Sequence, residues 1–444
     1  MTIYALSSGP GLSGLAVIRI SGDQCMKILK EIAKISNPIP RTATLTKFYN
    51  QESNEVIDEG IIIWFPSPKS YTGEDVLEFH VHGSRAVINS ILETLSKING
   101  CRIAEPGEFT KIALENGKID LLKAESIGDL IAAETEIQRR QAIDIMSGNH
   151  GKKYAKWREK LIKILSNIEA KIDFPEEDLP KNILEDIKKN SSNVKNEMIK
   201  ILDDQKVGER IREGFKIAIL GPANAGKSSL LNYLSRREVA IVSEVAGTTR
   251  DVIETHLNID GYPVIMSDTA GIRDAKDEIE KKGIKLALKK AEDADLNIVV
   301  IEPKNGYFTG VLRGLVNSDK TILVVNKSDL GTNKIENELE RFNPIYISIK
   351  NEANLNNLIS NIRDKLKNKF LSTEDTIITR ERHRQHLIKC VEHLENFENK
   401  NDTGDFDKAA EDLRLATRQL GMIVGKVDVE EILGSIFSDF CIGK

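Results

Sequence analysis

Short segments in which apolar and polar residues alternate run through about the first hundred residues of the chain. In the segment 76–81, for example, Leu77, Phe79 and Val81 alternate with Glu78 and His80. This period of two predicts β-strands, and two segments with apolar residues three and four positions apart predict helices. The predicted strands are 3–7, 15–20, 45–49, 60–65 and 76–81, and the predicted helices are 25–35 and 85–98. Residues 1–118 are therefore expected to form an α+β domain.

The hydrophobic pattern becomes helical at about residue 119. Apolar residues such as Leu161, Ile164 and Ile168 then recur at three- and four-residue steps among Lys, Glu and Arg, and the pattern returns after residue 372. Such stripes predict amphipathic helices that pack into a core. We therefore expect one helical domain built from two separate segments, 119–210 and 373–444, with the intervening residues inserted between them.

Strand-like and helix-like segments alternate in the inserted residues 211–372. The predicted strands are 216–220, 264–268, 297–301, 321–325 and 345–349. This alternation predicts a doubly wound α/β sheet, whose ligand binds beyond the carboxyl ends of the strands. The expected fold is thus multidomain, with an N-terminal α+β domain, a discontinuous all-α domain and an inserted α/β domain.

A phosphate-binding loop (P-loop) follows the first strand of the inserted domain. Residues 221–228 have the sequence Gly-Pro-Ala-Asn-Ala-Gly-Lys-Ser. The glycines let backbone N–H groups surround phosphate oxygens, Lys227 supplies a positive charge, and Ser228 offers a hydroxyl to Mg²⁺. Taken alone, the motif also occurs by chance as a glycine-rich turn. The residues expected to bind nucleotide are Asn224, Ala225, Gly226, Lys227, Ser228 and Ser229.

A second motif follows the next predicted strand of this domain. The carboxylate of Asp268 can reach Mg²⁺ through water, and a glycine N–H three residues later can approach the γ-phosphate. One strand downstream of a P-loop, this motif indicates a phosphate sensor. Its residues are Asp268, Thr269, Ala270 and Gly271.

The next two motifs predict the base of the nucleotide. The carboxylate of Asp329 can accept both the ring N–H and the exocyclic amine of guanine, and adenine has neither donor at those positions. Asn326 can tie this loop to the P-loop, and the stem of Lys327 can cover the base. The residues expected to contact guanine are Asn326, Lys327, Ser328, Asp329, Ser348, Ile349 and Lys350. The four motifs together predict a GTPase, and Asp329 argues against an ATPase.

The residue that orients the attacking water is left open by the motifs. Ile272 stands where small signalling GTPases have a water-orienting Gln, and isoleucine makes no hydrogen bond with its side chain. Glu280, Glu278 and Asp274 are the nearby candidates. Most carboxylates in such a segment are solvated charges on a helix surface.

The source of positive charge in the transition state is also left open. Arg250 and Arg273 are candidates by position, and the alternative is a monovalent cation held by the side-chain oxygen of Asn224. The segment before Arg250 is expected to be the first switch, in which Thr249 gives a second hydroxyl to Mg²⁺. Its residues expected to contact GTP are Ser243, Glu244, Val245, Ala246, Gly247, Thr248 and Thr249.

Composition narrows the class of protein further. The chain of 444 residues has a net charge of −5, so it has no overall attraction to nucleic acid. No segment approaches the roughly 20 apolar residues that span a bilayer, and we expect a cytoplasmic protein with no membrane contact. Its four cysteines, Cys25, Cys101, Cys390 and Cys441, are too dispersed to predict a disulfide framework or a zinc site.

Beside these motifs, the chain resembles the bacterial and organellar MnmE (TrmE) family of tRNA modification GTPases over essentially its full length. The resemblance rests on the GTPase motifs and on Arg-Ile-Ser-Gly at 19–22, Ser-Tyr-Thr-Gly-Glu-Asp at 70–75, Pro-Gly-Glu-Phe-Thr at 106–110, Asn-Gly-Lys-Ile-Asp at 116–120, Asp-Phe-Pro-Glu-Glu at 173–177 and Phe-Cys-Ile-Gly-Lys at 440–444. It implies a homodimer that acts with an FAD-dependent partner, MnmG (GidA), in a heterotetramer-type complex. The two would add an aminomethyl-type group to carbon five of the tRNA wobble uridine, with a tetrahydrofolate (5-formyl- or methylene-) as cofactor.

The resemblance also implies roles for particular residues. K⁺ would replace the arginine finger, held by Asn224, Ser243, Val245 and Thr248. Glu280 would orient the attacking water, which sets it above the other two carboxylates. The tetrahydrofolate would contact Arg19, Glu78, Lys118 and Lys444. Cys441 is a candidate for covalent chemistry, although an inert buried cysteine is at least as common.

Two points qualify these implications. The P-loop has Pro222 one place earlier than the family's usual proline, and serines and an alanine replace usual glycines at Ser13, Ala16 and Ser84. The main alternative function is a regulatory GTPase that acts as an RNA- or ribosome-binding switch, and such proteins share the apolar residue at position 272. They usually carry a basic RNA-binding module, which is not evident in this chain.

Overall fold

The computed structural model describes residues 1–9, 11–173, 183–237, 254–268, 288–303, 314, 316, 319–331, 337–370, 376–403, 406–426 and 443. The chain forms two compact units. The first contains residues 1–128, 145–159 and 417–444, and the second contains residues 129–144 and 160–416. Each unit has a β-sheet and its own hydrophobic core. Among the described residues, no helix combines the length and apolar character needed to cross a bilayer.

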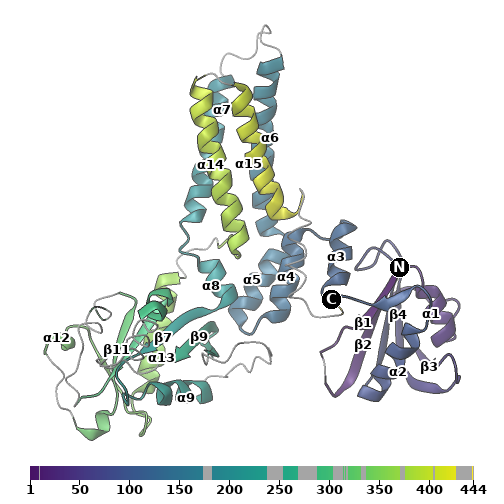
Figure 1. The fold of residues 1–444 in the computed structure, drawn as a ribbon, viewed down its shortest axis with the longest axis horizontal. Helices are drawn as coiled ribbons and strands as arrows, with labels where there is room; N and C mark the ends of the chain where they lie inside the picture. Colours follow the sequence, from purple (N-terminus) through teal and green to yellow (C-terminus); the bar gives the residue numbers. More distant parts are fainter. Residues whose placement is uncertain are drawn as a thin grey trace, which may run out of the picture. The chain divides into compact units, whose positions relative to one another are not determined.

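The first unit is organised around a mixed sheet (Figure 1). Its strands lie in the order β3-β4-β5-β2-β1-β6. Neighbouring strands are antiparallel except β1 and β6, which are parallel. The strands are β1 (Thr2–Leu6), β2 (Ser13–Ser21), β3 (Thr44–Tyr49), β4 (Val56–Phe65), β5 (Val76–Gly83) and β6 (Cys101–Ile103).

Helices pack on both faces of this sheet. Helices α1 (Cys25–Ile32) and α2 (Arg85–Ser96) cover one face, where they bury residues such as Ile18 and Phe79. Helix α3 (Glu108–Glu115) packs on the other face, where Phe109 contacts a small core around Ile3. Because successive strand residues point to opposite faces, the residues next to Ile18 and Phe79 in sequence share the face that carries α3. Arg19 and Glu78 are among them.

The second unit contains the predicted doubly wound sheet, with strand order β12-β11-β10-β7-β9-β8. All neighbouring strands are parallel except β8 and β9, which form an antiparallel hairpin. Helices α9 (Lys227–Arg237) and α13 (Leu355–Phe370) pack on one face, and α12 (Asn337–Glu340) contributes to the core on the other. The strands are β7 (Phe215–Leu220), β8 (Glu254–Ile259), β9 (Tyr262–Asp268), β10 (Leu296–Ile301), β11 (Thr321–Val325) and β12 (Ile345–Tyr346).

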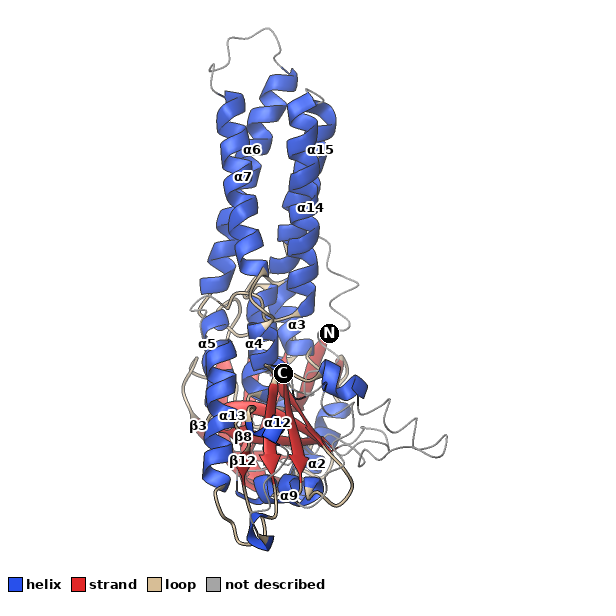
Figure 2. Ribbon diagram, turned by 90° about the vertical axis from the view of Figure 1, so that its left-hand side faces the viewer, coloured by secondary structure: helices blue, strands red, loops and turns tan. Residues whose placement is uncertain are grey.

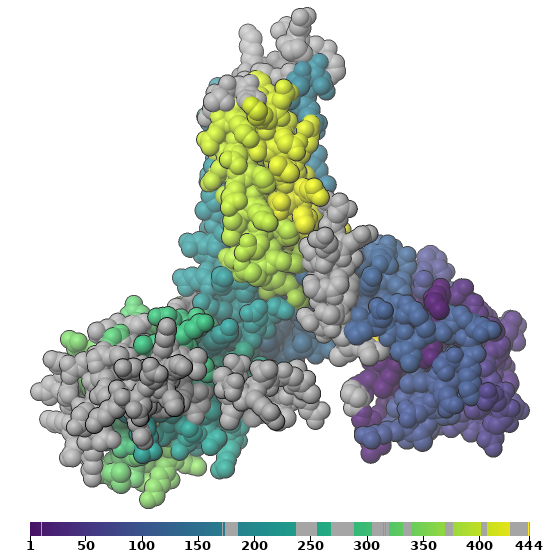
Figure 3. Space-filling model, viewed as in Figure 1, coloured from purple at the N-terminus to yellow at the C-terminus, as the bar shows by residue number. Residues whose placement is uncertain are grey.

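Long helices from both sides of this sheet in the sequence lie side by side (Figures 1 and 2). Within the second unit, Lys160 of α6 pairs with Glu197 of α7 at 2.9 Å, and Arg414 of α15 pairs with Glu169 of α6 at 3.0 Å. Side chains of α14 adjoin those of α7 in the space-filling view (Figure 3). These long helices are α6 (Asn149–Asp173), α7 (Ile183–Leu202), α14 (Glu381–Thr403) and α15 (Phe406–Val424). Three shorter helices are α4 (Leu121–Ala132), α5 (Glu136–Met146) and α8 (Val207–Glu213). The predicted fold class, with a discontinuous helical domain around an inserted α/β domain, is confirmed.

The structure adds elements that the pattern analysis missed. Strand β8, the short strand β6 and helix α3 were not predicted. Strand β12 is also shorter than expected, because the backbone of Ser348 turns to form a bridge with Ala353. The predicted domain limits at residues 118, 210 and 372 stay predictions.

Candidate nucleotide-binding site

The P-loop between β7 and α9 approaches two other strands very closely. A Cβ atom on Gly221, which has φ +144°, would lie 2.1 Å from the carbonyl oxygen of Val300 in β10. A Cβ atom on Gly226, which has φ +100°, would lie 2.2 Å from Nδ2 of Asn326, which follows β11. Only glycine accommodates both the positive φ and the contact. These glycines therefore bring the loop against the carboxyl ends of the neighbouring strands.

Helix α9 begins at Lys227, so its first backbone N–H groups face the loop. Lys227 is 6% exposed, and its ammonium donates a hydrogen bond to the carbonyl oxygen of Pro222 at 2.9 Å. The same carbonyl accepts the N–H of Ala225 at 3.4 Å, so Pro222 takes part in the turn of the loop. The helix N-terminus and the Lys227 ammonium together make this a favourable place for an anion.

The base-binding loop after β11 is fastened to the P-loop by Asn326. The buried amide of Asn326 donates to the carbonyl oxygen of Ala225 at 2.8 Å, and its Oδ1 accepts the N–H of Ile349 at 3.3 Å. One side chain thus joins three loops at the carboxyl edge of the sheet. This confirms the expectation that Asn326 ties the base-binding loop to the P-loop.

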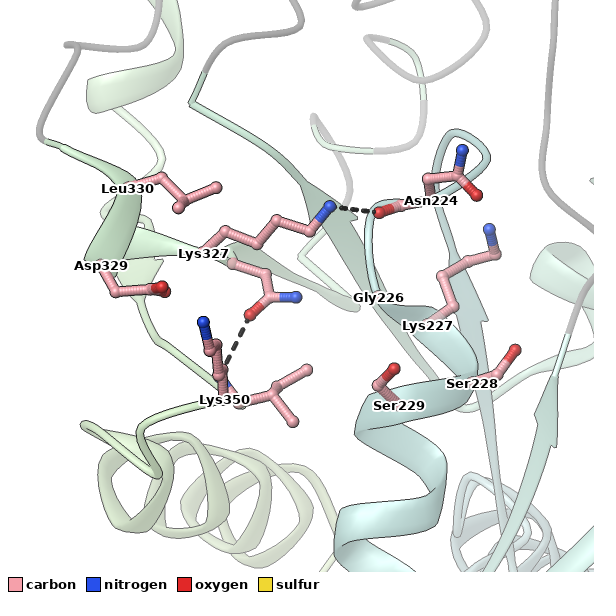
Figure 4. Close-up of a pocket in the computed structure, with 11 residues that line it drawn as sticks. Asn224, Gly226, Lys227, Ser228, Ser229, Lys327, Asp329, Leu330 and Lys350 are labelled. Carbon is pink, nitrogen blue, oxygen red and sulfur yellow. Dashed lines mark hydrogen bonds between the residues drawn. The ribbon is translucent and has the colours of Figure 1, made fainter.

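Lys327 makes a second connection between these loops. Its backbone has φ +62°, and its ammonium donates to the carbonyl oxygen of Asn224 at 2.8 Å (Figure 4). Asn224 is also left-handed, with φ +65°, a conformation that asparagine tolerates better than most residues. The ammonium also contacts the carboxylate of Glu302, which directly follows β10. Glu302 was not predicted, although its place after a central parallel strand is the signal that would have found it.

The carboxylate of Asp329 is oriented by a chain of hydrogen bonds. The hydroxyl of Ser348 donates to Asp329 Oδ1 at 2.6 Å, and the N–H of Asn351 donates to Ser348 Oγ at 3.2 Å. The hydrogen bond from Ser348 holds the pKa of the Asp329 carboxyl below its ordinary value. Asp329 is therefore ionised near pH 7, as an acceptor for two N–H groups must be.

A cavity of about 680 Å³ lies between the two loops. Figure 4 shows the P-loop side chains on one side of it and those of Lys327, Asp329 and Leu330 on the other. Its volume is in the range of small-molecule and cofactor sites. The lining residues are Asn224, Gly226, Lys227, Ser228, Ser229, Asn326, Lys327, Asp329, Leu330, Ile349 and Lys350. All but Leu330 were predicted to bind the nucleotide.

Several other predicted residues lie outside the described part of the chain. The backbone of Asp268 ends β9 beside Ile219 of β7, which places the start of the second motif at the same sheet edge as the P-loop. Its side chain is not described. The residues outside the description are Ser243, Glu244, Val245, Ala246, Gly247, Thr248, Thr249, Arg250, Thr269, Ala270, Gly271, Arg273, Asp274, Glu278, Glu280, Cys441 and Lys444.

Two predicted folate contacts form an ion pair on the sheet of the first unit. Arg19 in β2 and Glu78 in β5 are cross-strand partners, and their side chains meet at 3.0 Å. The Arg19 guanidinium also lies 5.4 Å from the ring centre of Tyr71 and 5.8 Å from that of Phe109. Burial raises the pKa of Tyr71. The arrangement offers a cation, a carboxylate and aromatic surface on one sheet face.

Lys118, the third predicted folate contact among the described residues, lies in the same unit as this pair. It lines a cavity of about 570 Å³ together with Asp23, Glu74 and Asp75, and neither Arg19 nor Glu78 belongs to that lining. Among the described residues, the structure thus pairs two of the predicted folate contacts and places the third at a cavity whose lining includes neither of them.

The C-terminal tail reaches the sheet of the first unit at Gly443. The hydroxyl of Ser7 donates to the Gly443 carbonyl oxygen at 2.6 Å. A Cβ atom on Gly443, which has φ +98°, would lie 2.2 Å from the carbonyl oxygen of Leu6 at the end of β1. Glycine is therefore required where the tail meets β1. Ser7 was not predicted, and no local sequence signal connects residues so far apart.

Comparisons with known proteins cover nearly the whole chain. The family model "GTP-binding protein TrmE N-terminus" matches residues 2–118, and the model "MnmE helical domain" matches residues 121–441. The chain is similar to proteins named tRNA modification GTPase MnmE in three bacteria. It is 65% identical to that of Pelagibacter ubique (strain HTCC1062) over 444 residues, covering 100% of both chains. It is 45% identical over 447 residues to that of Rickettsia bellii (strain RML369-C), with 100% of both chains covered. It is 47% identical over 445 residues to that of Wolbachia sp. subsp. Drosophila simulans (strain wRi), covering 100% of this chain and 99% of the relative.

Proposed function

Because the chain belongs to the MnmE family of tRNA modification GTPases, we propose that it hydrolyses GTP at the cavity between the P-loop and the base-binding loop, and that hydrolysis serves tRNA modification. The modification would be the addition of an aminomethyl-type group to carbon five of the wobble uridine. An FAD-dependent partner of the MnmG (GidA) kind would act with it in a heterotetramer-type complex in the cytoplasm. The domains would be residues 1–118, 119–210 with 373–444, and 211–372.

The observation that carries the nucleotide assignment is the Asp329–Ser348 pair. A carboxylate held by one hydroxyl and kept ionised can accept the N1–H and the exocyclic amine of guanine. Asn326 holds that loop against the P-loop at 2.8 Å, so base and phosphates would be held by one connected set of loops. An adenine would leave the carboxylate without donors, at a cost that favours guanine.

The residues around the cavity fit the ions that hydrolysis would use. Ser228 at the start of α9 offers a hydroxyl to Mg²⁺, with Thr249 as the second ligand and Asp268 reaching it through water. Asn224 lines the cavity and carries an amide oxygen suited to K⁺, with Ser243, Val245 and Thr248 completing the set. Bound K⁺ would supply the positive charge that an arginine finger gives elsewhere. Glu280 would orient the attacking water.

The exposed face of the N-terminal sheet supports a folate site and a homodimer. Leu45 is 69% exposed and Ile61 is 38% exposed, and they are cross-strand partners on β3 and β4. Because side chains alternate along β4 and β5, they share the face that carries Arg19 and Glu78. An apolar patch beside an ion pair suits contact with a second copy of the chain and with a tetrahydrofolate.

The C-terminal tail is the other part of the proposed folate site. Gly443 lies against the end of β1, and the adjoining Lys444 would contact the glutamate tail of the folate, with Lys118 as a further cation. The thiol of Cys441, two residues before Gly443, is the proposed group for any covalent step.

A nucleotide switch tests this function directly. Asp329→Asn replaces an acceptor with an amide that can donate to the extra oxygen of xanthine, so the variant should use XTP in place of GTP. With the partner flavoprotein and tRNA, the variant should modify wobble uridine only when XTP is supplied, and the wild type only with GTP. Unchanged GTP preference in the variant would overturn the base assignment. Hydrolysis that follows the switch without any modified uridine would favour the alternative, an RNA- or ribosome-binding switch.

A further inference from the structure

Glu302 holds the ammonium of Lys327 at the edge of the nucleotide cavity. The Glu302 side chain is 15% exposed, the Lys327 side chain is 35% exposed, and their charged groups are in direct contact. The same ammonium donates to the carbonyl oxygen of Asn224 at 2.8 Å, which Figure 4 shows as a link across the cavity. Glu302, Lys327 and Asn224 thus form a chain from the end of β10 to the P-loop.

Two of the three residues in this chain, Lys327 and Asn224, have left-handed backbones. Lys327 has φ +62° and Asn224 has φ +65°. Such conformations are costly for residues other than glycine and persist when surrounding contacts fix them. The hydrogen bond from the Lys327 ammonium fixes the orientation of the Asn224 carbonyl. That orientation in turn limits where the Asn224 side-chain oxygen can point.

The carboxylate of Glu302 determines how firmly this hydrogen bond is made. A flexible ammonium at the protein surface can exchange a carbonyl for water at little cost. A carboxylate beside it lowers that freedom, because charge-assisted hydrogen bonds are shorter and stronger than neutral ones. Removing the charge of Glu302 should therefore loosen the bond to Asn224 without touching Asn224 itself.

We propose that Glu302 is a positioning residue which, through Lys327, sets the conformation of Asn224 and so sets how tightly the P-loop holds K⁺. This inference rests on the proposed function, in which Asn224 is a K⁺ ligand. The proposed role differs from that of a merely structural ion pair in what a substitution would change. A structural pair would affect folding stability alone, whereas a positioning residue changes the K⁺ concentration at which hydrolysis is half-maximally stimulated.

The test compares Glu302→Gln and Glu302→Asp with Glu292→Gln in the full-length protein. Glu292 is exposed, and its replacement by Gln removes the same charge at a place away from the cavity. GTP hydrolysis is measured over a KCl series at constant ionic strength. Glu302→Gln should raise the half-stimulating K⁺ concentration by about three- to tenfold, the scale of one partly exposed charged hydrogen bond. Glu302→Asp should lie between it and the wild type, and Glu292→Gln should match the wild type.

A second measurement avoids activity altogether. The melting temperature of each protein with GDP and aluminium fluoride is followed against KCl, because a ligand that binds only the folded state raises it. The KCl concentration at which the melting temperature has risen halfway should be higher for Glu302→Gln than for the wild type, by the same factor as in the hydrolysis assay. If the wild type responds to K⁺ and the Glu302→Gln variant has the same KCl midpoint as the wild type, only the role of Glu302 is overturned. A wild type that does not distinguish KCl from NaCl would overturn the proposed K⁺ site and this inference with it.

Discussion

Replacing Asn326 with alanine should separate nucleotide affinity from folding stability. Asn326 is 3% exposed, donates to the Ala225 carbonyl at 2.8 Å and accepts from the Ile349 N–H at 3.3 Å. Each hydrogen bond contributes roughly 0.5–1.5 kcal/mol net, and a buried group left without its partner costs about 1–3 kcal/mol. The first bond is short and buried and the second is long, so the expected total is about 2–3 kcal/mol.

This loss should appear in the affinity for GDP because Asn326 joins the loops on either side of the cavity. Since about 1.4 kcal/mol corresponds to a factor of ten, the expected weakening is about 30- to 140-fold if the whole loss falls on binding. Fluorescence titration with a labelled GDP measures the dissociation constant, and urea unfolding of the same samples measures the free energy of unfolding. Both should change in Asn326→Ala.

Asn297 provides a matched control in the same sheet. Its buried amide donates to the carbonyl oxygen of Ala291 at 3.2 Å, at the opposite end of β10 from the nucleotide cavity. Asn297→Ala should lower the free energy of unfolding and leave GDP affinity unchanged. If Asn326→Ala also leaves GDP affinity within a factor of about two, the loops do not depend on Asn326 and the reasoning is refuted.

Three further predictions address other contacts. The hydrogen bond from Ser348 lowers the pKa of Asp329, so GDP affinity in the wild type should fall only as the pH drops through that lowered pKa. In Ser348→Ala the fall in GDP affinity should begin at a higher pH. Identical pH dependences of GDP affinity in the two proteins would contradict this. Arg384→Ala leaves Glu209 buried without its cation. The free energy of unfolding in urea should therefore fall by about 3–5 kcal/mol, and a loss below about 1 kcal/mol would contradict this. Gly443→Ala places a Cβ 2.2 Å from the carbonyl oxygen of Leu6 in β1, which the backbone cannot accommodate without moving. Calorimetry should show that 5-formyl-tetrahydrofolate binds about tenfold more weakly or worse. Equal affinities would refute the role of the Gly443 contact in folate binding.

The sequence predicted the nucleotide cavity well because its chemistry is local. The P-loop that contains Asn224 begins directly after β7, Asn326 to Asp329 begin directly after β11, and parallel strands bring their carboxyl ends to one sheet edge. The apolar segments also placed the predicted strands of this sheet, which do not include β8, within a few residues of their observed bounds. The dipeptide Asp260-Gly261 is typical of a two-residue hairpin turn, and it connects β8 to β9. This pattern could have predicted β8.

Contacts between distant segments could not be predicted in the same way. The hydrogen bond from Ser7 to Gly443 joins residues 436 positions apart, and no periodicity or motif encodes such a pairing. The contact between Glu302 and Lys327 depends on the order of strands in the sheet, which places β10 beside β11.

The central claim is that GTP hydrolysis by this chain serves modification of the wobble uridine in tRNA. Mass spectrometry of nucleosides in tRNA from cells that lack the chain, and from the same cells given the wild type or Asp329→Asn, tests it most directly. We predict a modified wobble uridine that is lost without the chain, restored by the wild type and not restored by the variant. Wobble uridines that are identical in all three samples would contradict the account.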